Sequence, residues 1–441
     1  MPFHAGNLIV WLTNHRHQWR QLLVGAIYRN STISLADQVV ASATNFLTGI
    51  IIARICVKEE LGIYMLGFTI ILLIHELQTS LISAPYMVFS PRLSAKNRSL
   101  YMGSSLVQYL TLSILVIVAL LLGILVISYG FGSTDLATAI KALCYVIPFI
   151  MLRELVRRFC FANMKMGTAF IIDCIVAASQ LGALATLAYS GFLSSNTAFY
   201  SIGFASGLTV LGWLVVKRHC YSFHQDHIWR DFKKNFSFGK WTLASSLLWT
   251  LGMTIYPWLL AYFHGTASTG VWAACWGIIA VANPILLGMQ NFLGPKIVQS
   301  FTSNNPLLLK QFVLKVTIIS LLIVTPLAII LSIFGGQLVV LFYGDKYSNN
   351  GHIVSILAIN LLVITTSYTL SRALLAMEQA RLYFLANIVP LIVILSIGAF
   401  FVKQFGAMGV AWGLLLGYVT TSITMFYMFL ILINRAIILK K

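Results

Sequence analysis

The feature that most constrains this chain is the alternation of its basic residues between long apolar segments. Of its 29 Lys and Arg residues, 24 fall in every second gap between those segments. Lys and Arg collect in the cytoplasmic loops of membrane proteins, so the alternation predicts repeated membrane crossings with both termini in the cytoplasm. A chain of this kind works as a transporter, a channel, a receptor or a membrane-embedded enzyme.

The composition supports the same topology. Hydrophobic residues make up 59% of the chain and charged residues 9%, against about a quarter charged in soluble proteins. A helix needs about 20 apolar residues to cross a bilayer, whereas the strands of a β-barrel are shorter and alternate. The net charge of +18 fits attraction to anionic lipid head groups better than nucleic-acid binding. We therefore expect an all-α, multi-pass protein with about twelve spans, at 33–55, 63–88, 101–128, 138–160, 167–190, 196–216, 241–263, 270–293, 312–334, 351–375, 382–402 and 407–433.

The longest internal cytoplasmic connection divides these spans into six and six. The predicted segments are a cytoplasmic segment 1–32 with an interfacial helix at 14–29, a six-helix bundle 33–216, a cytoplasmic linker 217–240, a second bundle 241–433 and a cytoplasmic tail 434–441. The halves are faintly similar: Ala41, Ser42 and Gly49 match Ala244, Ser245 and Gly252. Two repeats in the same orientation are typical of alternating-access transporters, although chance similarity between apolar helices explains the match equally simply.

Polar and aromatic side chains recur at helical spacing on the first two spans of each half. Such stripes face a bundle interior or a wet cavity, because polar groups are costly against lipid. Hydrogen bonds between helices are the simpler explanation for any single Ser or Thr. Four stripes at equivalent positions favour a shared central cavity. The stripes include Asp37, Gln38, Ser42, Asn45 and Thr48; Thr69, Glu76, Thr79 and Ser83; Thr242, Ser246, Trp249 and Thr250; and Trp272, Trp276, Asn283 and Gln290.

Two acidic residues lie within the predicted spans of the first half. Glu76 sits near mid-span, where a charge costs about 2.5–3.5 kcal/mol on insertion scales. Either it is a protonated structural residue or it binds a proton, Na⁺ or a ligand. Asp37 lies about one turn inside its span, where a helix N-terminal role competes with a functional one. Both are candidates for coupling transport to a proton or Na⁺ gradient.

A basic cluster ends the fourth predicted span. Arg153, Arg157 and Arg158 flank Glu154, which can pair with the last two at helical spacing. Asp173 in the next span could pair with one of these arginines. Anchoring at the cytoplasmic surface explains the cluster, and the mouth of a phosphate-binding cavity is the alternative.

Signatures of catalysis and of metal binding do not occur in the sequence. There is no P-loop, no nucleophile motif and no loop long enough for a soluble catalytic domain. The six cysteines are scattered, which indicates neither a disulfide framework nor a metal site. The cluster of His219, Cys220, His224 and His227 fits no standard zinc ligand spacing. We therefore predict a protein without an enzymatic site, a metal or an organic cofactor.

The stretch 35–93 resembles the start of a known transporter family. It contains Asp37-Gln38, Thr44-Asn45-Phe46, Ala53-Arg54 and Glu59-Glu60-Leu61-Gly62-Ile63-Tyr64. These segments are similar to those of Wzx-like polysaccharide-unit flippases, the polysaccharide transporters of the multidrug/oligosaccharidyl-lipid/polysaccharide (MOP) superfamily. The resemblance implies two six-helix bundles around a central cleft lined by the first, second, seventh and eighth helices. Twelve spans, rather than fourteen, argue against the lipid II branch.

The resemblance implies a flippase for an undecaprenyl-pyrophosphate-linked oligosaccharide in the bacterial inner membrane, serving O-antigen, exopolysaccharide or capsule synthesis. Membrane lipids, a polysaccharide polymerase and chain-length machinery are the implied partners. Basic side chains would hold the pyrophosphate, and aromatic faces would stack on sugars. The predicted substrate contacts are Gln38, Asn45, Arg54, Arg153, Arg157, Arg158, Lys240, Trp249, Trp272, Trp276, Asn283, Gln290 and Arg372.

Two other functions fit the sequence less well. A cation-coupled multidrug exporter would share the fold, and an apolar, acidic cleft with few arginines would favour it. A membrane glycan polymerase or ligase would usually carry a large external loop with catalytic Arg or His. The longest external loop here, about 334–350, contains neither.

Overall fold

The computed structural model describes residues 32–129, 133–289, 297, 306–377 and 379–438, and within these residues it contains helices and no strand. The first span is Thr32–Ile55. The elements that follow it are α2 (Lys58–Gln78), the π-helical turn η1 (Thr79–Ser83), α3 (Ala84–Phe89), the 3₁₀ turn η2 (Ser90–Arg92), α4 (Ala95–Ser128), α5 (Thr134–Ala162), α6 (Met166–Tyr189), α7 (Ser195–Val216), the 3₁₀ turn η3 (Arg218–Cys220), α8 (Gln225–Ala280), α10 (Pro306–Tyr343), the 3₁₀ turn η4 (Asp345–Tyr347), α11 (Gly351–Ala376), α12 (Ala380–Val393), the π-helical turn η5 (Ile394–Gly398) and α13 (Ala399–Ile438).

Ten of the described helices are long and apolar enough to cross a membrane. Two of them are divided by a glycine with non-helical backbone angles, Gly265 (φ 80°, ψ 172°) in α8 and Gly406 (φ 57°, ψ −132°) in α13. Both glycines have a positive φ, which other residues rarely adopt. Two antiparallel spans meet at each of these turns, so the described helices supply the twelve predicted crossings. The predicted all-α, multi-pass fold is confirmed.

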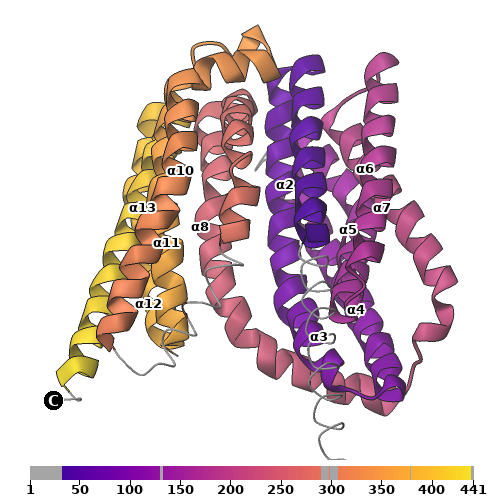
Figure 1. The fold of residues 1–441 in the computed structure, drawn as a ribbon. Helices are drawn as coiled ribbons and strands as arrows, with labels where there is room; N and C mark the ends of the chain where they lie inside the picture. The colour runs from indigo at the N-terminus through magenta and orange to yellow at the C-terminus, as the bar shows by residue number, and fades with distance from the viewer. Residues whose placement is uncertain (1–31, 130–132, 290–296, 298–305, 378, 439–441) are drawn as a thin grey trace, which may run out of the picture.

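The helices form two groups, which Figure 1 shows side by side: α2–α7 in one and α10–α13 in the other. We call the end of the molecule that carries α3 and η3 the lower end, and the end that carries η4 the upper end. The helix α8 connects the groups. It starts beneath the first group, turns upward and then runs along the side of α2. The predicted interfacial helix at 14–29 lies outside the described residues.

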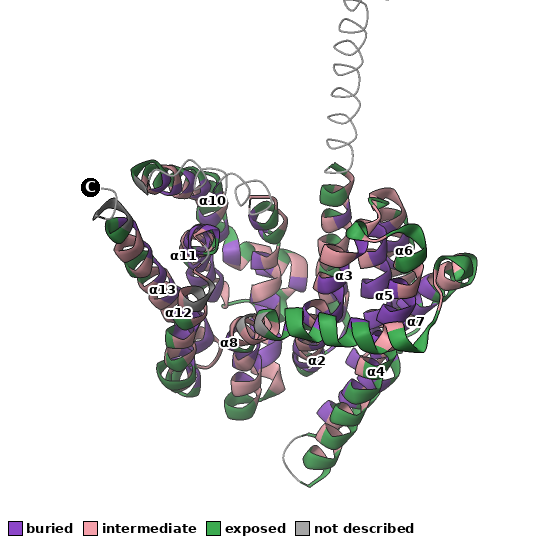
Figure 2. Ribbon diagram, turned by 90° about the horizontal axis from the view of Figure 1, so that it is seen from below, coloured by how far each residue is buried: buried purple, intermediate pink, exposed green. Residues whose placement is uncertain are grey.

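The predicted linker 217–240 is largely helical, because α8 begins at Gln225 and continues past residue 241 without a break. Its buried residues Asp231, Asn235 and Gly239 are spaced by four and so share one face. That face packs on α4: the hydroxyl of Tyr101 donates to Asn235 (2.6 Å), whose amide donates to Gln108 (2.8 Å). Most of the other positions are exposed, as Figure 2 shows. The predicted domain boundaries stay predictions.

The two halves meet at the upper end where α2 crosses α8. A Cβ added to Gly62 would lie 1.9 Å from the carbonyl oxygen of Thr266, and one added to Gly270 would lie 2.0 Å from that of Lys58. Only glycine permits the two backbones to approach so closely, as small residues do at helix crossings in membranes. This glycine pair therefore fixes where the first half touches the second.

Candidate functional site

Side chains reinforce the contact between the halves at the upper end. The guanidinium of Arg54 donates to the carbonyl oxygens of Phe342 (2.8 Å from Nε) and Leu341 at the end of α10. Phe46 of the first span packs edge-on against Phe342, with ring centroids 5.3 Å apart. The structure thus places Arg54, a predicted phosphate contact, on backbone carbonyls of the other half. Its proposed role in substrate binding stays a prediction.

A second interhalf contact lies just beyond the membrane spans. The ammonium of Lys346 in η4 donates to the carbonyl of Cys56. Burial, the largest cause, and nearby Glu60 together raise the pKa of the Cys56 thiol to about 11, although Lys346 acts to lower it. Burial lowers the pKa of Lys346. Both shifts follow from desolvation, which disfavours the charged form of each group.

The second half contains a pocket of about 200 Å³ with a neutral lining. Its rings, Trp249, Trp276, Tyr368 and Tyr418, come from four spans. Trp249 lies 6.2 Å from Tyr368 and 6.1 Å from Tyr418, centroid to centroid. Trp272 is buried beside the pocket and stacks on Trp276 at 5.7 Å. No ionisable acid or base other than tyrosine lines it. The lining residues are Trp249, Met253, Trp276, Ile279, Ala280, Asn283, Leu286, Leu357, Asn360, Leu361, Ile364, Tyr368 and Tyr418.

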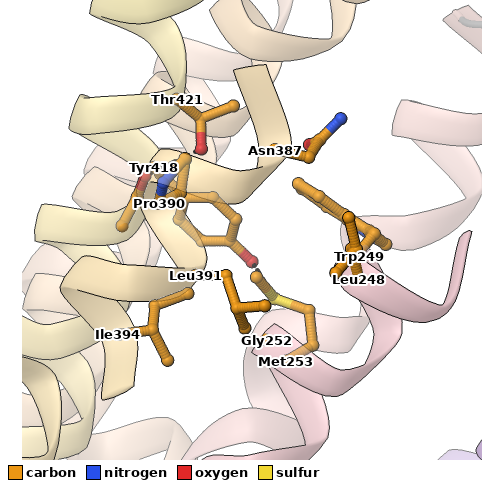
Figure 3. A pocket seen from close by; sticks show the side chains of 11 residues that line it. Leu248, Trp249, Gly252, Met253, Asn387, Pro390, Leu391, Ile394, Tyr418 and Thr421 are labelled. Atoms are coloured by element: carbon orange, nitrogen blue, oxygen red, sulfur yellow. Dashed lines mark hydrogen bonds between the residues drawn. The ribbon is translucent and has the colours of Figure 1, made fainter. Parts of the chain in front are cut away.

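A smaller hollow adjoins this pocket and shares Trp249, Met253 and Tyr418 with it (Figure 3). The hydroxyl of Tyr418 donates to the sulfur of Met253 at 2.9 Å, which joins α13 to α8. Helical spacing explains how the walls form. Trp249 and Met253 are four residues apart, and Tyr418 and Thr421 are three apart, so each pair shares one helix face.

Sequence reasoning found part of this pocket. Trp249, Trp276 and Asn283 were predicted, and the structure brings them together. It missed Asn360, Tyr368 and Tyr418, because the polar stripes were sought on the first two spans of each half, whereas these residues lie on α11 and α13. Asn360, an amide within an apolar span, was the signal that could have identified α11.

Glu76 is half-buried on α2, just before the π-helical turn. Ser80 donates to its carboxylate at 3.4 Å and lies 3.2 Å from the hydroxyl of Ser246 on α8. The carboxylate of Glu76 and the hydroxyls of Ser80 and Ser246 therefore lie together where the first half contacts α8. The predicted role of Glu76 in coupling stays a prediction.

The arginine cluster forms a network of ion pairs at the lower end of the first half. Arg157 contacts three carboxylates, those of Asp37 (2.7 Å), Glu154 (2.9 Å) and Asp173 (2.6 Å). Arg153 also pairs with Asp173 (2.7 Å). The predicted pairings of Glu154 and Asp173 are confirmed, while the contact between Asp37 and Arg157 is new. The network ties together the first span, α5 and α6.

The remaining predicted contacts are dispersed. Gln38 is half-buried and Asn45 is exposed on the first span, while Lys240 and Arg372 are exposed on α8 and α11. Arg158 pairs with Glu154 in the network. Gln290 lies outside the described residues. No group of three His, Cys, Asp or Glu side chains suited to a metal ion occurs among the residues that the structure describes. The roles of all these residues stay predictions.

Comparison with known proteins identifies the family. Residues 27–302, more than half of the chain, match the family model "Polysaccharide biosynthesis protein". The chain belongs to this family. It is also similar to a "Putative O-antigen transporter" of Shigella flexneri, with 22% identity over 287 residues that cover 64% of this chain and 67% of the relative. The predicted resemblance to MOP-superfamily polysaccharide transporters is confirmed.

Solved structures share the fold of this family member. One is an inward-facing multidrug resistance MATE family transporter of the MOP superfamily, with a TM-score of 0.74 and 18% identity, covering 89% of this chain and 94% of that one. Another is a MOP superfamily transporter from Pyrococcus furiosus described as having a binding pocket of reverse polarity, with a TM-score of 0.66 and 17% identity, covering 93% and 96%. Family and fold together make this chain a multi-pass membrane transporter.

Proposed function

We propose that this transporter flips an undecaprenyl-pyrophosphate-linked oligosaccharide across the bacterial inner membrane by alternating access. The main support for this proposal is the 200 Å³ pocket of the second half, which we call the aromatic pocket. Rings offer apolar faces to the C–H faces of sugars, while the amides of Asn283 and Asn360 can bind hydroxyl groups. An uncharged site suits a glycan better than a drug cation. The lipid tail would stay in the bilayer.

The pyrophosphate requires a basic contact separate from that pocket. Lys240 and Arg372 are exposed near the lower end and could meet it there. Arg153, Arg157 and Arg158 would do so only by exchanging a carboxylate for phosphate, because each is ion-paired. The positive-inside rule would place the lower end in the cytoplasm, where the lipid-linked unit is made.

Transport would be driven by a proton or Na⁺ bound at Glu76, whose carboxylate lies on the α2 face that contacts α8. Asp37, the other predicted coupling residue, is held by Arg157 and would need that pair to open. The product would pass to a polymerase with its chain-length machinery, for O-antigen, exopolysaccharide or capsule. A cation-coupled multidrug exporter is the second candidate, and the half-buried carboxylate of Glu76 is the observation that favours it.

Reconstitution tests the substrate directly. Liposomes containing the transporter and a lipid-linked oligosaccharide should expose the glycan to an added glycosidase faster than protein-free liposomes. Trp249→Ala removes a ring that borders both hollows and should slow exposure about tenfold. Trp412→Ala is the matched control, because Trp412 is 41% exposed on α13 and lines neither hollow. Transport of an organic cation without any glycan exposure would overturn the flippase proposal.

A further inference from the structure

A second cavity, of about 600 Å³, lies at the lower end of the first half. It is distinct from the aromatic pocket and is formed by α3, the start of α4, the end of α5, the start of α6, the end of α7 and η3. Its volume falls in the usual range for ligand sites, about 300–1,000 Å³. We call it the Arg98 cavity. The lining residues are Tyr86, Ala95, Arg98, Ser99, Met102, Phe159, Cys160, Asn163, Lys165, Thr168, Trp213, Lys217, His219 and Cys220.

The lining of the Arg98 cavity has basic side chains and no acidic one. Arg98, Lys165 and Lys217 enter it from three different elements, and His219 borders it. None of these four forms an ion pair with any carboxylate in the described part of the chain. Asp173, an acid near Cys160, is already engaged by Arg153 and Arg157. Like charges that converge without a counterion repel one another, so the cavity is built for an anion.

Two buried donors at the cavity also lack an acceptor. Nε of Arg98 and the indole nitrogen of Trp213 have no hydrogen-bond partner among the described residues. Arg98 itself is held in place, since it donates to Asn163 (3.1 Å) and to the carbonyl of Leu93 (3.3 Å). A buried donor without a partner costs about 1–3 kcal/mol. An anion with several acceptor oxygens would satisfy donors of this kind.

Two helices begin at the cavity and add to its positive potential. Ala95 opens α4, and α6 opens beside Lys165 and Thr168. Neither helix has a side-chain cap on its first turn. The free N–H groups of a first turn carry partial positive charge and bind phosphate. Side chains and backbone therefore favour the same ligand.

We infer that the Arg98 cavity binds a phosphate group, supplied either by the head group of an anionic membrane lipid or by a soluble phosphate compound. The cavity lies at the lower end beside the start of α8, so it is close to the membrane surface. Basic pockets between helices on the cytoplasmic side of membrane proteins hold lipid head groups in this way. This site shares no lining residue with the aromatic pocket and does not depend on the proposed flippase activity.

The test uses the full-length protein and the double variant Lys165→Gln/Lys217→Gln. This variant removes two charges from the cavity and leaves the hydrogen bonds of Arg98 intact. The control Lys233→Gln/Lys234→Gln removes the same charge from the exposed face of α8. Native mass spectrometry in detergent would measure retention of phosphatidylglycerol against phosphatidylcholine. Thermal shift with glycerol 3-phosphate and with inorganic phosphate, in detergent without lipid, would measure the soluble source.

If the Arg98 cavity binds phosphate, the wild-type protein should bind one of these probes saturably. The Lys165→Gln/Lys217→Gln variant should weaken that binding about tenfold, and the Lys233→Gln/Lys234→Gln control should weaken it less than twofold. Preference for phosphatidylglycerol without a response to soluble phosphates identifies a lipid site, and the reverse identifies a soluble ligand. Trp213→Phe, which removes one unpaired donor, should weaken binding severalfold without unfolding the protein. Equal losses in the cavity variant and the control would overturn the proposal, as would the absence of saturable binding of any probe.

Discussion

The two halves of this transporter use different chemistry in the interior of one fold. The first half buries charges: Arg157 lies among three carboxylates from three helices. The second half encloses a pocket of rings and amides, and its sequence from residue 241 onward contains only two acidic residues, Asp345 and Glu378. Ion pairs fix helices in one arrangement, whereas a neutral aromatic pocket leaves room for a ligand. Ion pairs therefore hold the helices of the first half together, and the second half carries the pocket that we propose contacts the glycan.

The strongest test of this difference is removal of the central arginine. Arg157→Ala would leave Asp37, Glu154 and Asp173 close together without their common partner. Breaking a buried ion pair by removing one member costs about 3–5 kcal/mol, so the midpoint of thermal unfolding in detergent should fall sharply. Arg92→Ala is the control, because Arg92 is exposed and has no ion pair among the described residues.

Adding Asp37→Asn to Arg157→Ala should recover part of the loss, because it removes one uncompensated charge. If Arg157→Ala alone were as stable as Arg92→Ala, the ion-pair network around Arg157 would not be what stabilises the first half.

The proposed coupling role of Glu76 sets this residue apart from the ion-paired acids of the same half. Gln keeps the shape of this side chain and its contact with Ser80 but cannot titrate. If Glu76 carries the coupling cation, Glu76→Gln should insert at normal levels and lose transport, measured as lipid-linked units that accumulate in cells. Glu59→Gln, at an exposed position on the same helix, should transport normally. Full export by a well-expressed Glu76→Gln protein would remove the coupling role and leave the flippase assignment untouched.

Removing the hydroxyl group from each of two buried tyrosines should change the free energy of unfolding by smaller amounts and in opposite directions. In the second half the hydroxyl of Tyr256 is buried with no partner among the described residues, and it lies against Gly398 and Gly413. In the first half Tyr109 donates to the carbonyl of Pro148 at 2.7 Å. Tyr256→Phe should raise the free energy of unfolding by up to about 1 kcal/mol, and Tyr109→Phe should lower it by about 1 kcal/mol. Equal changes in thermal stability would contradict the difference in hydrogen bonding.

The smallest effect concerns the contact between the halves at Cys56 and Lys346, which we call the joint. Because the folded state raises the pKa of Cys56 to about 11, its thiol retains a proton above the unfolded pKa of 9.0. The resulting stabilisation is complete below pH 9.0 and is lost as pH rises through about 11. A variant with Cys56 as its only cysteine should therefore be alkylated slowly at pH 9, in contrast to one that retains only the exposed Cys220. Lys346→Met should slow the alkylation of Cys56 further, because Lys346 lowers the pKa of this thiol. Rapid alkylation of Cys56 at neutral pH would mean that the joint opens readily.

Several helix limits were predictable from the apolar pattern. The span predicted at 351–375 is Gly351–Ala376, and that at 196–216 is Ser195–Val216. Other helices extend beyond their apolar segments: α4 begins at Ala95 rather than at residue 101, and α10 covers Pro306–Tyr343 rather than 312–334. Hydrophobicity reports the length that lies in lipid. Backbone hydrogen bonding continues past the membrane wherever packing supports it.

The sequence alone determined the number of crossings, the helical class and the family, because each depends on local apolar length and on short motifs. It also indicated the pairs within Arg153–Arg158, since residues three and four apart meet on any helix. Only the tertiary structure joined Arg157 to Asp37, 120 positions away, or brought Trp249 against Tyr368 and Tyr418. Such contacts depend on the angle and depth at which helices cross. Close approaches like that of Gly62 to Gly270 set those angles, and no single segment encodes them.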